Sequence, residues 1–142
     1  MIFLCGVVFD QLIKYFVDKF QPSFVVLNGF INIKYAKNTG GMYSLFENNN
    51  FVFIIVSVFI LVSLYFIVFK MKKDNICKVE NVLWQFVFAG GVSNLIDRIF
   101  RGYVVDFIAM KPFGIFNISD ALIVVSVCVL LLLYIVKSKK FS

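Results

Sequence analysis

The run from Phe51 to Phe69 constrains the fold of this chain more than any other part of its sequence. It contains no charged side chain and ends at a lysine-rich segment that begins with Lys70. A helix of about 20 apolar residues is long enough to cross the hydrocarbon core of a bilayer. We therefore predict that residues 51–69 form a transmembrane helix whose lysine-rich end lies in the cytoplasm.

The composition extends this interpretation to the whole chain. Hydrophobic residues fill 61% of the 142 positions, 19 residues are phenylalanine, and the mean hydropathy is +0.94. Soluble domains have an apolar share of about 45–50%. We expect an all-α membrane protein, a single membrane-embedded domain over residues 1–142, with four transmembrane helices at about 1–18, 51–69, 81–100 and 115–136.

Lysines cluster at residues 70–78 and again at 137–140, which predicts how these helices are oriented. Cytoplasmic connections carry such an excess of positive charge. Both chain ends are therefore expected in the cytoplasm. The net charge of +6 needs no nucleic-acid partner to explain it.

The segment 23–46, between the first two spans, has a different pattern. Asn28-Gly29 between apolar runs is a strong hairpin signal, and the residues from Ile31 to Ala36 alternate at the period of a half-buried strand. We predict a small β-sheet outside the membrane. Asn38 and Gly40 then fall in a flexible stop where a backbone could approach a ligand closely.

Cysteine and histidine usage excludes several kinds of site. The three cysteines are scattered, no CxxC motif occurs, and the chain has no histidine. A disulfide framework, a zinc site and a Cys-His nucleophile are all disfavoured. We expect no metal and no cofactor.

An acid and a base lie one helical turn apart in the first span. Asp10 and Lys14, with Gln11 beside them, have the i, i+4 spacing that puts both charges on one helix face. Two interpretations stay open. The pair either neutralises itself so that a polar spot is tolerated in a span, or it takes a direct part in catalysis.

A stripe of polar side chains lies at the end of the third span that is far from the lysine-rich connection. Its members recur at helical spacing: Asn94, Asp97, Arg98 and Arg101. Two glycines just before the stripe, Gly90 and Gly91, would let a neighbouring helix approach closely. Ionisable groups at membrane depth are costly enough to indicate a functional site.

Two further carboxylates follow the stripe. Asp106 lies in the connection after the third span, and Asp120 lies near the start of the fourth. Because both lysine-rich segments are cytoplasmic, this connection must lie at the opposite face. Two carboxyl groups held close together tend to share one proton, and one ionised and one protonated carboxyl are the base and acid that activate water and cleave an amide.

Two other classes of function compete with hydrolysis as explanations of these residues. Buried acids with Lys14 could form a small proton or cation pathway, but the acids cluster at one interface and no repeated halves are visible. A structural or assembly subunit would leave the two outer carboxylates unexplained.

The motifs together resemble those of the lipoprotein signal peptidases, the signal peptidase II family, over almost the whole chain. The matching positions are Asp10-Gln11-x-x-Lys14, Asn38-x-Gly40, Gly90 through Asn94 to Asp97-Arg98, Gly102-x-Val104-Val105-Asp106-Phe107 and Phe116-Asn117-x-x-Asp120. Within these matches Ser93 and Ser119 stand where the family commonly has Gly and Ala.

The resemblance implies an aspartic endopeptidase in which Asp106 and Asp120 are the catalytic dyad. It also implies supporting or substrate-binding roles for a further set of residues: Asn38, Gly40, Asn94, Asp97, Arg98, Asn117, Asp10, Gln11 and Lys14. Such an enzyme removes the signal peptide of diacylglyceryl-modified prolipoproteins on the N-terminal side of the lipidated cysteine. Its partners would be these substrates and membrane lipid. It would act as a monomer in the bacterial inner membrane, with its active site at the outer face.

Overall fold

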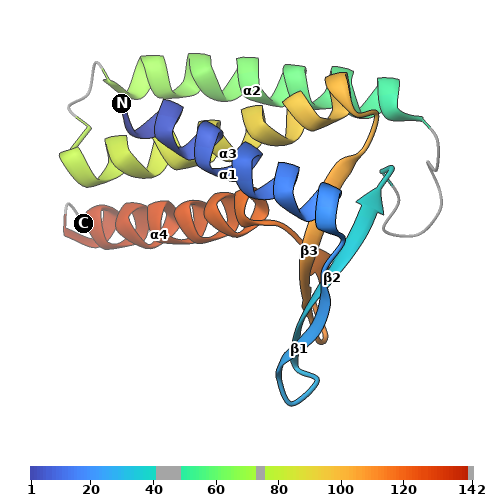
Figure 1. Cartoon of the computed structure of the whole chain (residues 1–142). Helices are drawn as coiled ribbons and strands as arrows, with labels where there is room; N and C mark the ends of the chain where they lie inside the picture. The colour runs from blue at the N-terminus through green and yellow to red at the C-terminus, as the bar shows by residue number, and fades with distance from the viewer. Residues whose placement is uncertain (41–48, 73–75, 141–142) are drawn as a thin grey trace.

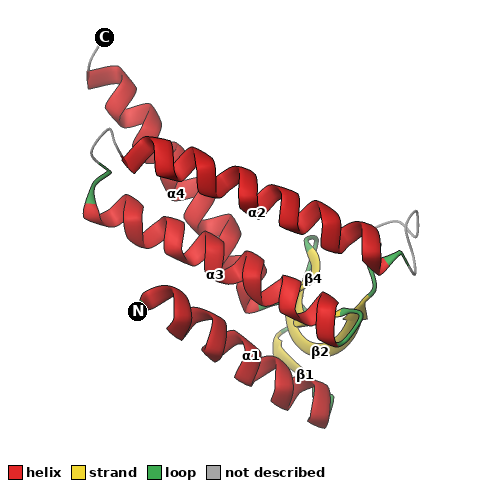
Figure 2. Cartoon of the chain, turned by 90° about the horizontal axis from the view of Figure 1, so that it is seen from above, coloured by secondary structure: helices red, strands yellow, loops and turns green. Residues whose placement is uncertain are grey.

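The computed structural model describes residues 1–40, 49–72 and 76–140. Four helices run side by side in it (Figures 1 and 2): α1 Ile2–Phe20, α2 Asn50–Lys72, α3 Lys78–Phe100 and α4 Ile118–Lys140. Helix α3 packs against each of the other three. Polar side chains on α3 can therefore reach three different helices.

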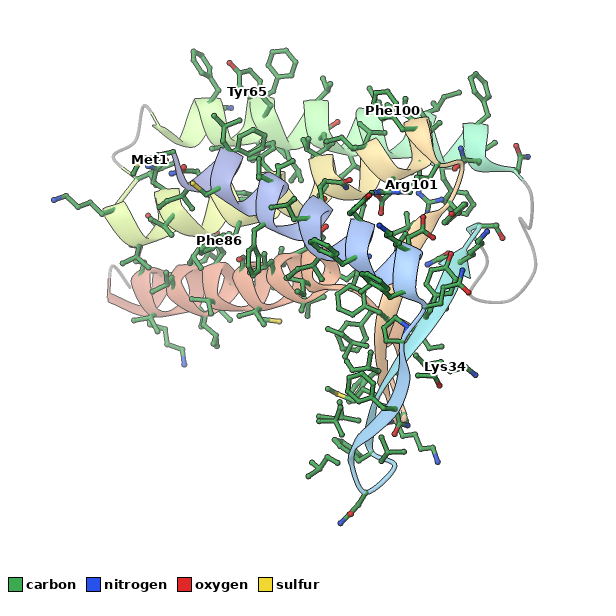
Figure 3. All side chains as sticks on the ribbon, viewed as in Figure 1. Met1, Lys34, Tyr65, Phe86, Phe100 and Arg101 are labelled. Carbon is green, nitrogen blue, oxygen red and sulfur yellow. The ribbon has the colours of Figure 1, made fainter. Side chains whose placement is uncertain are left out.

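Helices α2 and α4 are long and apolar enough to cross a membrane, over residues 50–70 and 118–139. Their large apolar side chains mostly point outwards, as Tyr65 does from α2 in Figure 3. Helices α1 and α3 are less apolar because they bury charged residues, among them Asp10, Lys14 and Asp97, inside the bundle. A continuous apolar exterior around a charged interior suits a protein surrounded by lipid.

A four-stranded antiparallel sheet projects to one side of the bundle, across the direction of the helices (Figure 1). Its strands, in spatial as well as chain order, are β1 Ser23–Leu27, β2 Ile31–Asn38, β3 Val104–Met110 and β4 Gly114–Phe116. The start of α1 and the end of α4 lie at the opposite end of the bundle.

The predicted hairpin is confirmed. Strands β1 and β2 pair in antiparallel register, and Asn28 and Gly29 between them have φ values of 37° and 74°. Two consecutive positive φ angles are the requirement of a two-residue hairpin turn. The rest of the predicted β-rich segment, residues 41–46, lies outside the described residues.

The sheet predicted between the first two helices is present but is larger than predicted. Half of its strands, β3 and β4, come from the connection between α3 and α4. Four consecutive residues, Val104 to Phe107, are buried, so the alternation that marks a half-buried strand is missing there. Residues 115 and 116 belong to β4, and the fourth helix begins only at Ile118.

The two glycines of α3 allow close helix packing, as predicted. A Cβ atom at Gly90 would lie 2.7 Å from the Ser119 carbonyl oxygen at the start of α4. One at Gly91 would lie 2.7 Å from Leu61 Cδ2 on α2. Since real Cβ atoms do not approach other atoms so closely, glycine brings α2 and α4 up to α3 one turn before Asn94.

A small hydrophobic core joins the sheet to the bundle. Val17 near the end of α1 packs with Val105 and Phe107 of β3. This contact fixes β3, the strand that carries Asp106, against the first helix.

Candidate active site

The structure brings Asp106 and Asp120 to one cavity. Asp106 lies on β3 with 2% of its surface exposed, and Asp120 lies in the first turn of α4. Both line a cavity of about 620 Å³ between the sheet and the start of α2, together with Asn38, Gly40 and Arg98. Asp106 and Asp120 follow Asn38 in the sequence by 68 and 82 positions, yet all three residues line the same cavity.

Three asparagines orient the two carboxylates. Asn38 Nδ2 donates to Asp106 Oδ2 at 2.8 Å, and Asn117 Nδ2 donates to Asp106 Oδ1 at 2.8 Å. Asn94 Nδ2 donates to Asp120 Oδ1 at 2.8 Å. Both oxygens of Asp106 therefore receive an amide donor.

The orientation of each asparagine amide is itself fixed by a donor on its carbonyl oxygen. The Gly40 backbone N–H donates to Asn38 Oδ1 at 3.0 Å, and the Asp120 backbone N–H donates to Asn117 Oδ1 at 2.9 Å. Asn94 Oδ1 accepts from Lys14 Nζ at 2.7 Å. An amide whose oxygen is occupied must present its NH₂ group to the carboxylate.

Gly40 has a conformation and position that only glycine fits. Its φ is 111°, and a Cβ atom there would collide with the Phe53 ring. The close approach of this backbone to a ligand stays a prediction, since the group that lies against Gly40 in the structure is the Phe53 ring of α2.

Asn117 and Asp120 form a reciprocal cap at the start of α4. The Asn117 backbone N–H donates to Asp120 Oδ2 at 3.2 Å, in return for the bond from the Asp120 N–H to Asn117 Oδ1. This is a capping-box arrangement, which satisfies two backbone donors that a helix start leaves free. The same motif that begins α4 therefore fixes the Asp120 side chain.

Burial is the main influence on the acidity of Asp106. It raises the pKa of this carboxyl from 3.8 to about 6, with the Asp120 charge acting in the same direction. The bonds from Asn38 and Asn117 and the charge of Lys14 act the other way, towards the ionised form. A carboxyl that titrates near neutral pH can exchange a proton under physiological conditions.

Lys14 lies at the centre of a buried network beneath the cavity. Its Nζ contacts Asp10 Oδ2 at 2.8 Å, Asp97 Oδ2 at 3.0 Å and Asn94 Oδ1 at 2.7 Å. These three acceptors use all three N–H donors of the ammonium group. Through Asn94, the network reaches Asp120.

The predicted ion pair of Asp10 and Lys14 is thus confirmed, but it is not isolated. Asp97 accepts from Lys14 and also from Arg101, which Figure 3 shows at the end of α3 beside α1. Two carboxylates and two cations balance in this cluster. Neutrality of this kind makes a buried charged group tolerable.

Gln11 and Ser93 complete the network. Gln11 Nε2 donates to Ser93 Oγ at 2.9 Å and to Asp97 Oδ1 at 2.9 Å, and its Oε1 accepts from Arg101 Nη1 at 3.0 Å. Ser93 Oγ donates to Asp10 Oδ2 at 2.6 Å. The role of Ser93 is not evident from the sequence, because only the packing of α1 on α3 shows that its hydroxyl meets a carboxylate.

Arg98 differs from the other polar residues of the α3 stripe. Its Nη1 is buried and has no hydrogen-bond partner among the described residues. The guanidinium carbon lies 4.6 Å from the centre of the Phe53 ring. Because Arg98 lines the cavity with Asp106 and Asp120, this donor is available to a ligand there.

Asp120 lies where three cavities meet. Besides the 620 Å³ cavity, it lines one of about 220 Å³ between α2, α3 and α4, whose other walls include Leu61, Val87 and Ile123. It also lines an apolar cavity of about 420 Å³ along α4 that includes Phe116 and Val124. A branched ligand could occupy all three.

Metal binding has no support in the part of the chain that the structure describes. No group of three or more Asp, Glu, Cys or His side chains there is arranged to hold a metal ion. The three cysteines, Cys5, Cys77 and Cys128, are exposed and unpaired.

Comparison with known proteins identifies similar chains. The family model described as signal peptidase (SPase) II matches residues 2–136. A lipoprotein signal peptidase of Caldicellulosiruptor bescii is 36% identical over 122 residues, which cover 84% of this chain and 79% of that protein. One of Staphylococcus aureus is 34% identical over 133 residues, 89% of this chain and 80% of that protein.

Two solved structures of bacterial membrane enzymes have the same fold. One, determined at 2.3 Å resolution, gives a TM-score of 0.84 at 30% identity and covers 99% of this chain and 89% of its own. The other, at 1.9 Å, gives 0.80 at 31% identity over 94% of this chain and 89% of its own.

Proposed function

Because the chain belongs to the signal peptidase II family, we propose that it removes the signal peptide of diacylglyceryl-modified prolipoproteins, cutting on the N-terminal side of the lipidated cysteine. Asp106 and Asp120 are the catalytic pair in this proposal. The observation that carries it is the orientation of both carboxylates, by Asn38, Asn94 and Asn117, towards one cavity.

The reaction is amide hydrolysis by a pair of carboxyl groups that holds one proton. The ionised carboxyl takes a proton from water, whose oxygen attacks the carbonyl carbon of the residue before the cysteine. The protonated carboxyl gives its proton to the carbonyl oxygen. When the tetrahedral intermediate collapses, the C–N bond breaks and the first carboxyl gives the proton that it took from water to the cysteine nitrogen. The second carboxylate takes a proton from a hydroxyl of the intermediate, so the pair again holds one proton.

Arg98 and the asparagines supply the remaining functions. Arg98 Nη1, which has no partner among the described residues, can donate to the carbonyl oxygen as negative charge develops there, or to the substrate backbone. Asn38, Asn94 and Asn117 hold the carboxyl groups, so little reorganisation is needed during the reaction. Asp97 supports the site indirectly, because its oxygens accept from Lys14, Gln11 and Arg101 and not from the catalytic carboxyl groups.

The three cavities that meet at Asp120 suit the three branches of such a substrate. The 620 Å³ cavity beside the sheet, which is lined by Asn38, Arg98 and both carboxylates, suits the peptide that bears the scissile bond and continues into the mature protein. The apolar cavity along α4 suits the lipid on the cysteine. The 220 Å³ cavity between the helices exceeds the roughly 150 Å³ that holds a benzene molecule, so it can take an aliphatic side chain of the signal peptide.

The protein is a membrane enzyme by family and by structural similarity. In our proposal all four helices span the inner membrane, with both chain ends in the cytoplasm. The sheet and the two carboxylates then lie at the outer face, where an exported prolipoprotein is met. Conduction of protons or cations, the alternative from the sequence, is not favoured by membership of a peptidase family.

A cleavage assay tests the function. The purified protein in detergent is incubated with a diacylglyceryl-modified prolipoprotein and with the same precursor lacking the lipid, and the masses of the products are measured. We expect cleavage of the lipidated precursor at the bond before the modified cysteine, and little of the other. Equal cleavage of both would contradict the lipid requirement, and cleavage of neither would contradict the function.

A further inference from the structure

The two carboxylates of the site come from separate parts of the fold. Asp120 belongs to the helix bundle, and Asp106 belongs to the sheet that projects from it (Figure 1). Acid–base catalysis by a pair requires a fixed separation between its members. Some part of the chain must therefore hold the sheet in register with the bundle.

One face of α1 carries a charged residue at every fourth position, Asp10, Lys14 and Asp18. Residues four apart on a helix lie one above another. The first two belong to the buried network that reaches Asp120 through Asn94. Asp18 does not contact that network, and it lies on the same face of α1 one turn closer to the sheet.

Asp18 accepts hydrogen bonds from two tyrosines of the sheet region. The Tyr35 hydroxyl donates to Asp18 Oδ1 at 2.5 Å, and the Tyr103 hydroxyl lies 3.1 Å from the same oxygen. Burial, with the Asp18 carboxylate next in effect, raises the pKa of Tyr35 well above its usual range. The hydroxyl therefore remains a donor at any physiological pH.

Each tyrosine precedes a site residue by three positions on one of two paired strands. Tyr35 lies on β2 three residues before Asn38, and Tyr103 directly precedes β3, three residues before Asp106. These strands pair at Ala36 with Asp106 and at Asn38 with Val104. Asp18 thus ties together the two strands that present Asp106 and the amide that binds it.

We propose that Asp18, with Tyr35 and Tyr103, is a positioning group that sets Asp106 and Asn38 against Asp120. One face of α1 then positions both catalytic carboxylates. Lys14 positions Asp120 through Asn94, and Asp18 positions Asp106 through the two tyrosines. The proposal rests on the proposed peptidase function.

The test uses hydroxyl and carboxylate deletions in the full-length protein. Tyr35→Phe and Tyr103→Phe are made singly and together, with Asp18→Ala and the conservative Asp18→Asn. Asn keeps an Oδ1 atom, the acceptor of both hydroxyls. Tyr15→Phe is the matched control, because Tyr15 lies on the same helix with 53% of its side chain exposed. The kcat, KM, pH dependence and thermal midpoint are measured with lipidated precursor.

A displacement of reacting groups by about 1 Å can cost about a hundredfold in rate, so we expect the double Phe variant and Asp18→Ala to lose roughly tenfold to a hundredfold in kcat. KM should change little, because no substrate contact is removed. Asp18→Asn should keep most of the activity, and Tyr15→Phe all of it. The kcat of each single Phe variant should lie between those of the parent and the double variant. The single variants therefore test the proposal even where the double variant folds poorly.

Two further readouts separate positioning from general support. Among the described residues, the charged groups that face Asp106 are Asp120 of α4, Lys14 of α1 and Arg98 of α3. The variants of Asp18, Tyr35 and Tyr103 leave all three in place. If these variants displace β2, the hydrogen bond from Asn38 to Asp106 is weakened. Because this bond lowers the pKa of Asp106, the apparent pKa of the pair should then rise. In an Asn38→Ala background Tyr35→Phe should have little additional effect, because coupled residues are not additive.

The inference is overturned when the variants show a lowered thermal midpoint but the parent's kcat per folded molecule and the parent's pH profile. Cleavage by the parent with unchanged variants would remove this inference alone. Failure of the parent and of Tyr15→Phe to cleave lipidated precursor would remove the peptidase function, and this inference with it.

Discussion

Each carboxylate of the site accepts a hydrogen bond from at least one asparagine amide whose orientation is fixed. Asn117 has the largest share, since its Nδ2 donates to Asp106 and its Oδ1 caps the Asp120 N–H. Asn117→Ala removes both bonds at once. Loss of a helix cap costs about 0.5–2 kcal/mol, so we expect a stable but weakened fold. The rate of cleavage should fall by a far larger factor than the decrease in the free energy of unfolding would explain. Both are measured on one preparation, the rate by product formation and the stability by urea denaturation.

The pH dependence of the rate follows from Asp106. Its pKa of about 6 lies above the ordinary value of 3.8, so the carboxyl loses its proton as pH rises through about 6. Asp106 can then no longer give a proton, and the acid needed by the amide is lost. We expect kcat/KM to fall on the alkaline side with an apparent pKa of about 6 or higher that belongs to the pair. A rate that rises steadily from pH 5 to pH 9 would contradict a shared proton.

The residues of the site were largely predictable because their spacing carries chemistry. The stripe Asn94, Asp97, Arg98 and the pair Asp10 and Lys14 have helical periods, and helix packing then brings the two groups together. Ser93 and Asp18 were not predictable. A serine among small residues and an acid near a helix end have no local signal, and their roles depend on contacts with residues 83 or 17 positions away.

Among the elements, helix α1 has a structural role that its length and hydropathy do not indicate. Lys14 is fully buried between Asp10 and Asp97. Lys14→Met keeps the apolar stem but leaves two carboxylates without their shared cation. Breaking a buried ion pair costs about 3–5 kcal/mol, so the thermal midpoint should fall strongly. The exposed Lys19 on the same helix is the control, since Lys19→Met should be nearly neutral.

A compensating change makes this prediction specific. Adding Asp10→Asn to Lys14→Met removes one of the two stranded charges and should recover part of the lost stability. No recovery would mean that shape, and not charge, governs the site of Lys14.

At the same scale, the strands show where sequence patterns fail. The hairpin of β1 and β2 was predicted because a turn signal joins two adjacent strands. Strand β3 pairs with β2 across the whole of α2 and α3, and both faces of its first four residues are covered. A buried strand with a distant partner has neither an alternating pattern nor a turn beside it.

The molecule as a whole has one lysine-rich end and one end with the sheet, which fixes its expected orientation. A reporter enzyme that works only in the cytoplasm should be active when it is fused after Ser142, because this end of the chain is expected there. One inserted at Lys111, in the turn between β3 and β4, should report the outer side. Cytoplasmic location of the Lys111 fusion would remove the access of the two carboxylates to an exported substrate.

Asp106 and Asp120 are the proposed catalytic pair of this folded molecule. Asp106→Asn and Asp120→Asn keep the shape of each side chain but cannot exchange the proton that amide hydrolysis requires. General acid–base catalysis contributes roughly 10²–10⁴ in rate, so each variant should lose at least about a hundredfold.

The measurement is the rate of product formation from lipidated precursor by each purified variant, followed by mass spectrometry, beside thermal unfolding of the same samples. We predict cooperative unfolding near the parent midpoint and almost no product for both variants. Cleavage at close to the parent rate by either Asn variant, shown to be folded, would contradict the account.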